Sequence, residues 1–137
     1  MKFSQRSKGL FISFEGNEGS GKSTMVKILK DFLELKGFEV VATREPGGIA
    51  VSEDLRKIIL NYKLDSITEA FLFAAARKEH LSKLIKPALE NKKIVLCDRF
   101  VDSSIAYQGV GRNLGVQKII ELNKLAIENF YPDLTFV

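Results

Sequence analysis

The residues with the clearest chemical potential form a glycine-rich run near the N-terminus. The run is Gly16, Asn17, Glu18, Gly19, Ser20, Gly21, Lys22, Ser23 and Thr24. A glycine, any four residues and then Gly-Lys-Ser can point successive backbone N–H groups at phosphate oxygens, because glycine tolerates the dihedral angles that this wrapping needs. Lys22 adds a positive charge for the outer phosphates, and Ser23 adds a hydroxyl for Mg²⁺. A chance glycine-rich turn is the alternative, but an apolar segment before the run and a helical segment after it favour a phosphate-binding loop.

Asp98 is a second candidate for chemistry. It directly follows the apolar residues 94–97 and so ends an expected buried strand. A carboxylate in that position can hold Mg²⁺ directly or through a water molecule. Polar residues also follow strands as simple caps or turns, but the phosphate-binding loop favours the metal. We therefore expect Ser23 and Asp98 to be metal ligands.

Two pairs of residues allow both a functional and a structural interpretation. Arg44 and Glu45 precede Pro46-Gly47-Gly48, which fixes a tight turn, and they could be site charges or a surface ion pair. Phe73 and Arg77 are four residues apart, so they share one helix face. Such a face can stack a base and hold an anion, but it can equally be a core ring beside a solvated arginine.

Four further polar residues also allow both a functional and a structural interpretation. Ser104 and Gln108 follow the strand that ends in Asp98, and they could read the polar edge of a base, since an amide offers both a donor and an acceptor. A capped helical turn is the structural alternative. Arg56 and Arg99 carry the same ambiguity as the arginine of the Phe–Arg face.

The apolar pattern predicts the elements that position these residues. Continuous apolar runs predict buried strands, and apolar residues three and four apart predict helices. The expected strands are 10–14, 38–43, 94–97 and one beginning at 134; the expected helices are 21–36, one capped by Ser52, one opened by a capping box at 66–69 and kinked or broken by Pro87, and 116–130. Gly109, Gly111 and Gly115 predict a flexible loop.

Helices between apolar strands predict an α/β fold with a parallel sheet that is covered on both faces. Ligands of such sheets bind beyond the carboxyl ends of the strands. Residues 15–23, 44–48 and 98–99 follow three expected strands, so we expect the candidates to meet at one edge of the sheet. The length of 137 residues suits a single domain, residues 1–137.

Composition narrows the classes of function. The net charge is +4, but the basic residues are spread along the chain, so we do not expect nucleic acid as a partner. No apolar run approaches the ~20 residues that span a membrane, and the N-terminus does not resemble a signal peptide, so we expect a cytoplasmic protein. The one cysteine, Cys97, excludes an internal disulfide and is expected as a small buried strand residue. The one histidine, His80, is expected at the surface or an interface.

Taken together, these segments closely resemble the bacterial thymidylate kinases. The matching segments, in family order, are residues 14–24 (FEGNEGSGKST), 43–48 (TREPGG), 68–77 (TEAFLFAAAR), 98–100 (DRF), 102–109 (DSSIAYQG) and 131–135 (YPDLT). The first is shared by many enzymes, whereas REPGG with SSIAYQG is much more specific. The resemblance implies a P-loop kinase domain, a three-layer α/β/α sandwich like that of nucleoside monophosphate kinases. It also implies phosphoryl transfer from ATP to dTMP with Mg²⁺, giving ADP and dTDP, and a homodimer.

The resemblance also implies roles for individual residues. The catalytic residues would be Lys22, Glu18, Arg44, Glu45, Asp98 and Arg99, and residues 16–24 would bind ATP. The dTMP-binding residues would be Glu18, Arg56, Phe73, Arg77, Arg99, Ser104, Tyr107 and Gln108. In this set Phe73 would stack on thymine, Ser104 and Gln108 would contact the base edge, and Glu18 would lie near the 3′-hydroxyl and the metal.

The sequence departs from the family in two places. Family members continue beyond the YPD segment into a mobile lid, a last strand and an adenine-side segment, whereas this sequence ends at Val137, so we expect a chain with its C-terminal part absent. Gly19 stands where some members have an arginine. We therefore expect the 137-residue chain to bind dTMP better than it converts it, with Arg112 as the candidate substitute for a lid arginine. A weakly catalytic nucleotide-binding fragment and a P-loop kinase for another acceptor are the alternatives.

Overall fold

The computed structural model describes residues 6–17 and 19–137. Its strands are β1 (Leu10–Phe14), β2 (Val40–Arg44), β3 (Ile94–Asp98) and β4 (Leu134–Phe136). Its helices are α1 (Lys22–Leu35), α2 (Ala50–Asn61), α3 (Ser66–His80), α4 (Lys86–Glu90), α5 (Val101–Ser104) and α6 (Val116–Ile127), with π-helical stretches η2 (Leu81–Ile85) and η3 (Ile105–Gly111). In this part of the chain, no helix combines the length and apolarity needed to cross a membrane.

The four strands form one parallel sheet in the order β2-β3-β1-β4. The strands are in register at their carboxyl ends, where Asp98 is level with Arg44 on one side and with Phe14 on the other. Phe136 of the edge strand β4 is also level with Phe14. The side chains that follow β1, β2 and β3 therefore meet at one edge, as the sequence predicts.

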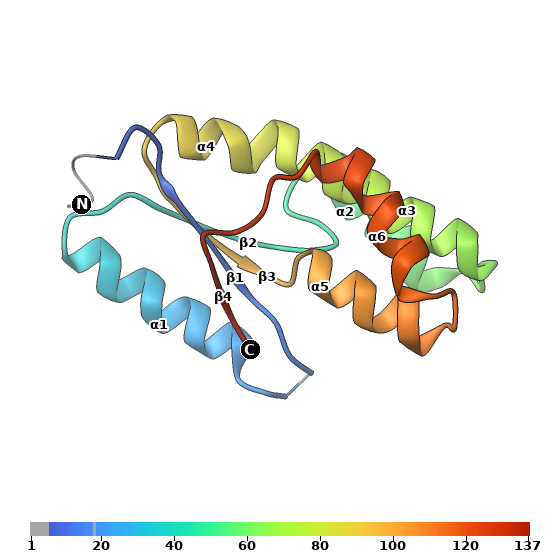
Figure 1. The fold of residues 1–137 in the computed structure, drawn as a ribbon. Coiled ribbons are helices and arrows are strands. Elements are labelled where there is room, and N and C mark those ends of the chain that lie inside the picture. The colour runs from blue at the N-terminus through green and yellow to red at the C-terminus, as the bar shows by residue number, and fades with distance from the viewer. Residues whose placement is uncertain (1–5, 18) are drawn as a thin grey trace.

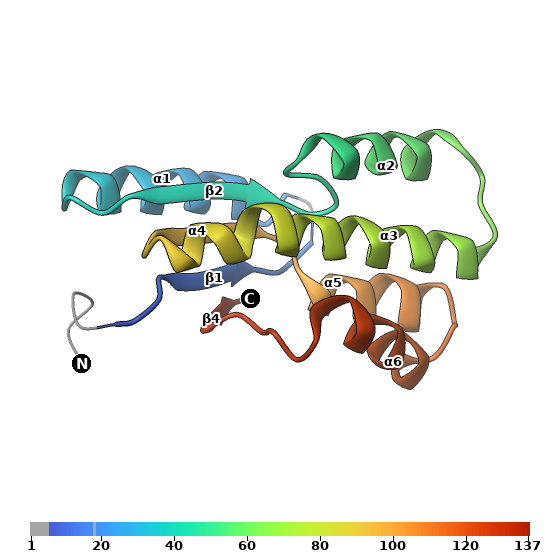
Figure 2. The same ribbon diagram turned by 90° about the horizontal axis from the view of Figure 1, so that it is seen from above.

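Alternating strand residues feed two core clusters, one on each face of the sheet. On one face, Phe11 and Val95 pack with residues of α3, η2, α4 and α6. On the other face, Phe14 and Leu96 pack with Val26 of α1. Figure 1 shows α1 on one side of the sheet and the other helices on the opposite side, and Figure 2 shows α2 lying beside α3. The predicted α/β fold with a parallel sheet covered on both faces is confirmed.

The helix that contains Pro87 is longer than the pattern suggests. The backbone stays helical from Ser66 to Glu90, through α3, η2 and α4. Proline lacks an N–H and its ring clashes with the carbonyl four residues earlier, so a regular helix cannot accept it in its interior. The interruption takes the form of η2, which directly precedes the proline and in which the Lys86 N–H bonds to the carbonyl of Leu81.

Two predicted helix caps were wrong. Ser66 is the first residue of α3 rather than its cap, because the Asp65 carboxylate accepts hydrogen bonds from the backbone N–H groups two and three residues later, at 3.0 and 3.2 Å. Ser52 lies inside α2, and its buried hydroxyl donates to the Ala76 carbonyl at 2.8 Å. Ser52 therefore joins α2 to α3.

The predicted flexible loop at the glycines was also wrong. Gly109 and Gly111 lie within the helical stretch η3, and only the short connection to α6 contains Gly115. A Cβ atom at Gly109 would lie 3.2 Å from the Cα atom of Val116. Gly109 thus lets η3 approach the start of α6 closely.

The ends of two elements also differ from the pattern. The second strand begins at Val40 instead of residue 38. The last helix ends at Ile127 instead of residue 130, because Glu128 and Asn129 adopt left-handed backbone conformations with φ of 50° and 61°.

Candidate active site

A cavity of about 710 Å³ lies at the carboxyl edge of the sheet. It receives residues from the glycine-rich loop, from the loop after β2, from α2 and α3, and from the segment after β3. The predicted site residues that line it are Gly19, Gly21, Lys22, Ser23, Thr24, Arg44, Glu45, Arg56, Phe73, Arg77, Asp98, Arg99, Ser104, Tyr107 and Gln108. The fold therefore brings segments far apart in sequence around one space.

Three predicted loop residues, Gly16, Asn17 and Ser20, do not line this cavity, and Glu18 lies outside the described residues. Gly19 and Gly21 have φ angles of 77° and 88°, a left-handed conformation that glycine adopts without strain. The loop thus turns sharply into the first turn of α1, whose free N–H groups and positive dipole end suit an anion. The arrangement fits the predicted phosphate-binding loop.

The oxygen ligands expected for Mg²⁺ lie together beneath the loop. The Ser23 hydroxyl donates to Asp98 Oδ2 at 3.3 Å, and Lys22 Nζ is 4.0 Å from Asp98 Oδ1. Asp98 Oδ1 is buried and has no hydrogen-bond partner within the described part of the chain. Hydroxyl and carboxylate oxygens are the donors that Mg²⁺ prefers. Ser23 and Asp98 therefore fit a magnesium ion.

Arg44 and Glu45 do not pair with each other, so the alternative of a surface ion pair between them was wrong. Arg44 donates to both carboxylate oxygens of Glu53 in α2, at 2.9 and 3.3 Å, and about half of its side chain is exposed. Glu53 also accepts from the Gly48 N–H at 2.9 Å. Both hydrogen bonds lower the pKa of Glu53, and the bond from Arg44 has the larger effect. Arg56, also in α2, donates to the Pro46 carbonyl at 3.0 Å.

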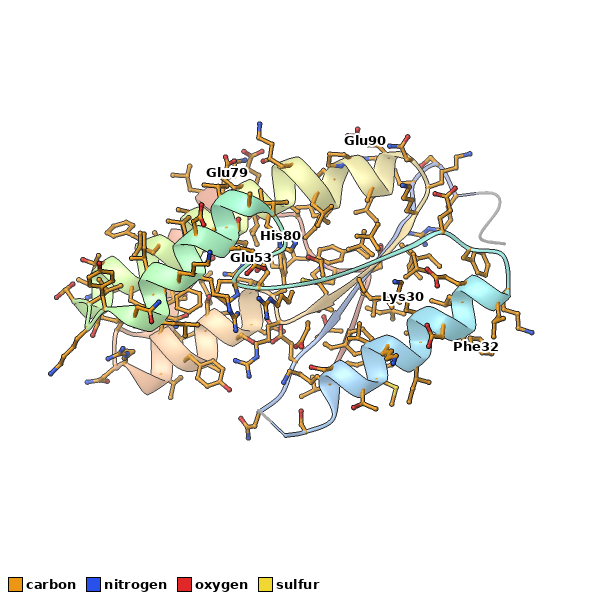
Figure 3. The ribbon with its side chains drawn as sticks, turned by 180° about the vertical axis from the view of Figure 1, so that it is seen from behind. Lys30, Phe32, Glu53, Glu79, His80 and Glu90 are labelled. Atoms are coloured by element: carbon orange, nitrogen blue, oxygen red, sulfur yellow. The ribbon has the colours of Figure 1, made fainter. Side chains whose placement is uncertain are left out.

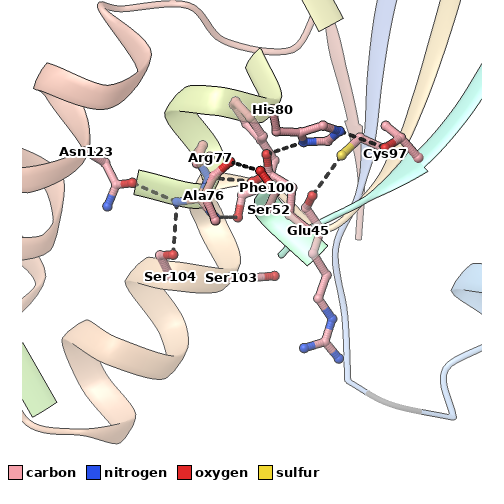
Figure 4. Close-up of polar contacts among 12 residues, drawn as sticks. Glu45, Ser52, Ala76, Arg77, His80, Cys97, Phe100, Ser103, Ser104 and Asn123 are labelled. Carbon is pink, nitrogen blue, oxygen red and sulfur yellow. Dashed lines mark hydrogen bonds and ion pairs between the residues drawn. The ribbon is translucent and has the colours of Figure 1, made fainter. Parts of the chain in front are cut away.

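Arg77 lies at the centre of a buried polar network (Figure 4). Its Nε donates to Glu45 at 2.5 Å, and its Nη1 donates to Ser104 at 3.0 Å and to Asn123 at 2.7 Å. Its Nη2 donates to the Phe100 carbonyl at 3.1 Å. Only 3% of Arg77 is exposed, so the alternative of a solvated arginine was wrong.

The predicted base-reading residues lie together on one side of the cavity. Phe73 is half-buried, while Ser104 and Gln108 are buried. The Gln108 Oε1 atom has no hydrogen-bond partner among the residues that the structure describes. The Arg99 guanidinium lies 5.3 Å above the ring of Tyr107, which also lines the cavity. A cavity lined by a flat ring and by a buried amide oxygen without a partner suits a planar ligand with an N–H donor at its edge.

The expectation that His80 lies at the surface or an interface was wrong. Its side chain is fully buried between α3 and the loop after β2, and Figure 3 shows it inside the molecule while Glu79 and Glu90 lie on the outer side of the same long helix. The expected burial of Cys97 is confirmed, and that burial raises the pKa of its thiol well above the ordinary value.

The sequence reasoning assigned no role to two residues of the site area, Glu15, which it placed at the edge of the sheet, and Asn123, which it did not consider. Glu15 accepts from the Phe100 N–H at 2.7 Å and from the Ser103 hydroxyl, and burial raises its pKa. Asn123 of α6 holds Arg77 and donates to the Ile119 carbonyl at 2.9 Å. Glu15 could have been found from its position, since it is a charged residue at the end of an apolar strand, like Asp98. Asn123 carries no comparable signal.

Arg112, the candidate substitute for a lid arginine, is not among the described residues that line the cavity. It forms an ion pair with Glu69 of α3, with 2.7 Å between Nη2 and Oε2. Arg112, which directly follows η3, thus ties the end of η3 to α3.

The fold and the cavity define a P-loop nucleotide-binding protein of the α/β class. Residues 14–137 match the family model described as "Thymidylate kinase". The chain belongs to the thymidylate kinase family.

Curated relatives and a solved structure agree with the family match. Thymidylate kinase of Geobacillus sp. (strain WCH70) is 56% identical over 131 residues, which cover 93% of this chain and 62% of that protein. Thymidylate kinase of Bacillus velezensis is 51% identical over 130 residues, which cover 93% and 61%. The crystal structure of thymidylate kinase from Ehrlichia chaffeensis superposes with a TM-score of 0.87 at 48% identity, over 93% of this chain and 74% of that one. The chain thus spans about 62% of the length of the Geobacillus relative.

Proposed function

We propose that the protein to which this chain belongs transfers a phosphoryl group from ATP to dTMP, giving ADP and dTDP. The observation that carries the proposal is a cavity that is lined both by the phosphate-binding loop and by Phe73, Ser104 and Gln108. Phosphoryl transfer needs little covalent chemistry from the protein, so placing two nucleotides end to end in one charged cavity supplies most of what is required.

On the donor side, the loop N–H groups and Lys22 bind and neutralise the phosphates of ATP. Ser23 and Asp98 would hold Mg²⁺, which supplies further neutralisation of the charge that develops on the transferred group. Arg44 and Arg99 reach the cavity from the ends of β2 and β3, where the two nucleotides would meet. The role of Glu18 near the 3′-hydroxyl stays a prediction.

On the acceptor side, Phe73 stacks on the base and Gln108 reads its edge. The unpartnered Oε1 atom of Gln108 needs a donor, and the N3–H group of thymine supplies one. Arg56, which is held on the Pro46 carbonyl, binds the phosphate of the monophosphate. This division of roles supports dTMP as the acceptor.

The assembly and the location are part of the proposal. Large apolar side chains of the helices after β2 and β3 are exposed, among them Ile67 and Phe71 of α3 and Leu125 of α6. They support a homodimer through these helices, which sedimentation analysis would test. A cytoplasmic location stays a prediction.

A coupled kinase assay with ATP and a panel of nucleoside monophosphates tests the proposal, on this chain and on any longer form from the same gene. We expect dTMP to be the preferred acceptor of the longer form, and dTMP binding to this chain in calorimetry. Preference for another monophosphate would assign a different acceptor. Nucleotide binding without turnover in both forms would favour a non-catalytic nucleotide-binding protein.

A further inference from the structure

His80 makes two hydrogen bonds that no role described above requires. Its Nδ1 lies 2.7 Å from Glu45 Oε2, and its Nε2 lies 2.7 Å from the Thr43 hydroxyl. A carboxylate only accepts hydrogen bonds, so these partners assign the imidazole proton to Nδ1. With the proton there, Nε2 accepts a hydrogen bond from the Thr43 hydroxyl. The ring is fully buried and belongs to the last residue of α3. It connects this helix to Thr43 in β2 and to Glu45 in the loop that follows β2.

The loop that His80 contacts holds three arginines of the cavity. Its Glu45 carboxylate accepts from Arg77, and its Pro46 carbonyl accepts from Arg56. Its Gly48 N–H donates to Glu53, which in turn binds Arg44. The orientation of all three guanidinium groups therefore depends on the position of this loop.

The imidazole also lies directly against the loop backbone. A Cβ atom at Gly48 would be 2.3 Å from His80 Nε2 and 2.4 Å from Thr43 Oγ1. The loop thus rests on the ring at Gly48 and is hydrogen-bonded to it at Glu45. A shift of the ring would displace the loop at two points.

A metal site is the competing interpretation of this cluster. Ligand atoms of Glu45, His80 and Cys97 lie within 4.8 Å of one another, and all three residues are buried. However, the two Glu45 oxygens already accept from Arg77 and His80, and both imidazole nitrogens are bonded. Burial raises the pKa of the Cys97 thiol, which disfavours the thiolate that a metal would need. The cluster is therefore complete without a cation.

We infer that His80 is a positioning residue for the acceptor nucleotide, acting through Glu45 and the loop 45–48. Its imidazole N–H orients the Glu45 carboxylate, which aims Arg77 at Ser104, and its ring supports the backbone on which Arg56 rests. The inference deepens the proposed function and rests on it. It predicts that a change at His80 weakens dTMP binding and leaves the ATP side, which the glycine-rich loop forms, unaffected.

Three variants separate the two hydrogen bonds of the ring. His80→Asn places an amide nitrogen near the Nδ1 position and keeps the donor to Glu45, whereas His80→Gln places it near Nε2 and loses that donor. Thr43→Val is the matched control, because it removes only the other bond at nearly constant shape. In the form active on dTMP, we expect His80→Gln to raise the KM for dTMP about ten- to a hundred-fold, the loss of one hydrogen bond to a charged group. We expect an unchanged KM for ATP in all three variants. The KM for dTMP should rise less in His80→Asn, which keeps the donor to Glu45 but not the ring, than in His80→Gln, and it should change little in Thr43→Val.

Equal effects of His80→Asn and His80→Gln, or equal rises of both KM values, would reduce His80 to a structural residue and overturn the inference. Because the chain has one histidine, ¹⁵N-labelled imidazole gives a single set of resonances. The Nδ1–H tautomer is expected, and it reports on the bond to Glu45 even if His80→Gln fails to fold; the Nε2–H tautomer would overturn the inference. Zn²⁺ that shifts these resonances and raises the Tm would favour the metal site instead. If the wild-type chain binds no dTMP although the Nδ1–H signal is present, the proposed function has failed rather than the contact.

Discussion

Replacing Arg77 by leucine should destabilise the fold far more than replacing Arg44 by alanine, although each arginine binds one glutamate. The Arg77–Glu45 pair is 3% and 2% exposed at its two side chains, whereas the Arg44–Glu53 pair is 52% and 34% exposed. A buried carboxylate that loses its partner keeps the cost of its desolvation, while an exposed one regains water.

The difference in free energy can be worked out from these two environments. Breaking a buried pair by removal of one partner costs about 3–5 kcal/mol, and an exposed pair contributes about 0–1 kcal/mol. Arg77→Leu also removes the donors to Ser104, Asn123 and the Phe100 carbonyl, which places it at the upper end of that range. At about 4 °C per kcal/mol, the value where the ranges for smaller and larger domains meet, a loss of about 4–5 kcal/mol should lower the Tm by about 16–20 °C.

Urea denaturation followed by circular dichroism measures both variants against the wild type, with equal m-values as the check on two-state unfolding. Arg77→Lys is a useful third variant, because it keeps the charge but not the planar fork that reaches several acceptors, and its loss should be intermediate. The reasoning is refuted if Arg77→Leu loses less than about 1 kcal/mol, or if it loses no more than Arg44→Ala.

Three further outcomes are expected. Lys22→Ala should lower turnover by about a hundred-fold or more with an unchanged circular dichroism spectrum, because among the described residues the Lys22 ammonium has polar contacts with the Asn17 carbonyl and Asp98 and is not part of the core. Near-wild-type turnover would remove Lys22 from the mechanism. Gln108→Leu should lower the preference for dTMP over dCMP and dGMP by about 1–3 kcal/mol in calorimetric titrations, and an unchanged preference would contradict the base-edge role. Burial raises the pKa of Glu15 in the folded state, so the wild type loses stability as the pH rises from 4.5 through the folded pKa. Glu15→Gln does not ionise, so its stability should increase relative to that of the wild type over the same pH range. Glu53 has a lowered pKa, so its contribution is lost as pH falls from 4.5, and Glu53→Gln should lose less stability in acid; urea denaturation across pH tests both signs.

The layers and the edge of the sheet could be predicted because their signals are local. An apolar run such as residues 94–97, which is too short for a helix and lies between polar segments, favours a strand, and the next residue, Asp98, then lies at the carboxyl edge. The glycine pattern of residues 16–21 likewise requires a loop of one shape. The structure adds that these local predictions meet around one cavity, which no single segment could show.

The burial of the polar residues could not be predicted, because their partners are distant in sequence. His80 bonds Glu45 across 35 positions, and Arg77 bonds Asn123 across 46. A histidine among charged helix residues has the same local pattern whether it faces solvent or a carboxylate. Gly109 shows the same limit, since its contact with Val116 gives it a packing role that its sequence context does not reveal.

The two sides of the cavity therefore differ in how the chain builds them. The phosphate side uses backbone N–H groups and residues at strand ends, so its geometry follows from the sheet itself. The acceptor side uses Arg56 of α2 and Arg77 of α3, which hydrogen-bond to the loop after β2, and Ser104 of α5, which accepts a hydrogen bond from Arg77. Stability alone does not require such bonds, because a well-packed apolar cluster can replace a buried ion pair at no cost. The hydrogen bonds around Glu45 instead hold each arginine in one orientation. A mutation that breaks one of these bonds should therefore first weaken the affinity for the acceptor nucleotide.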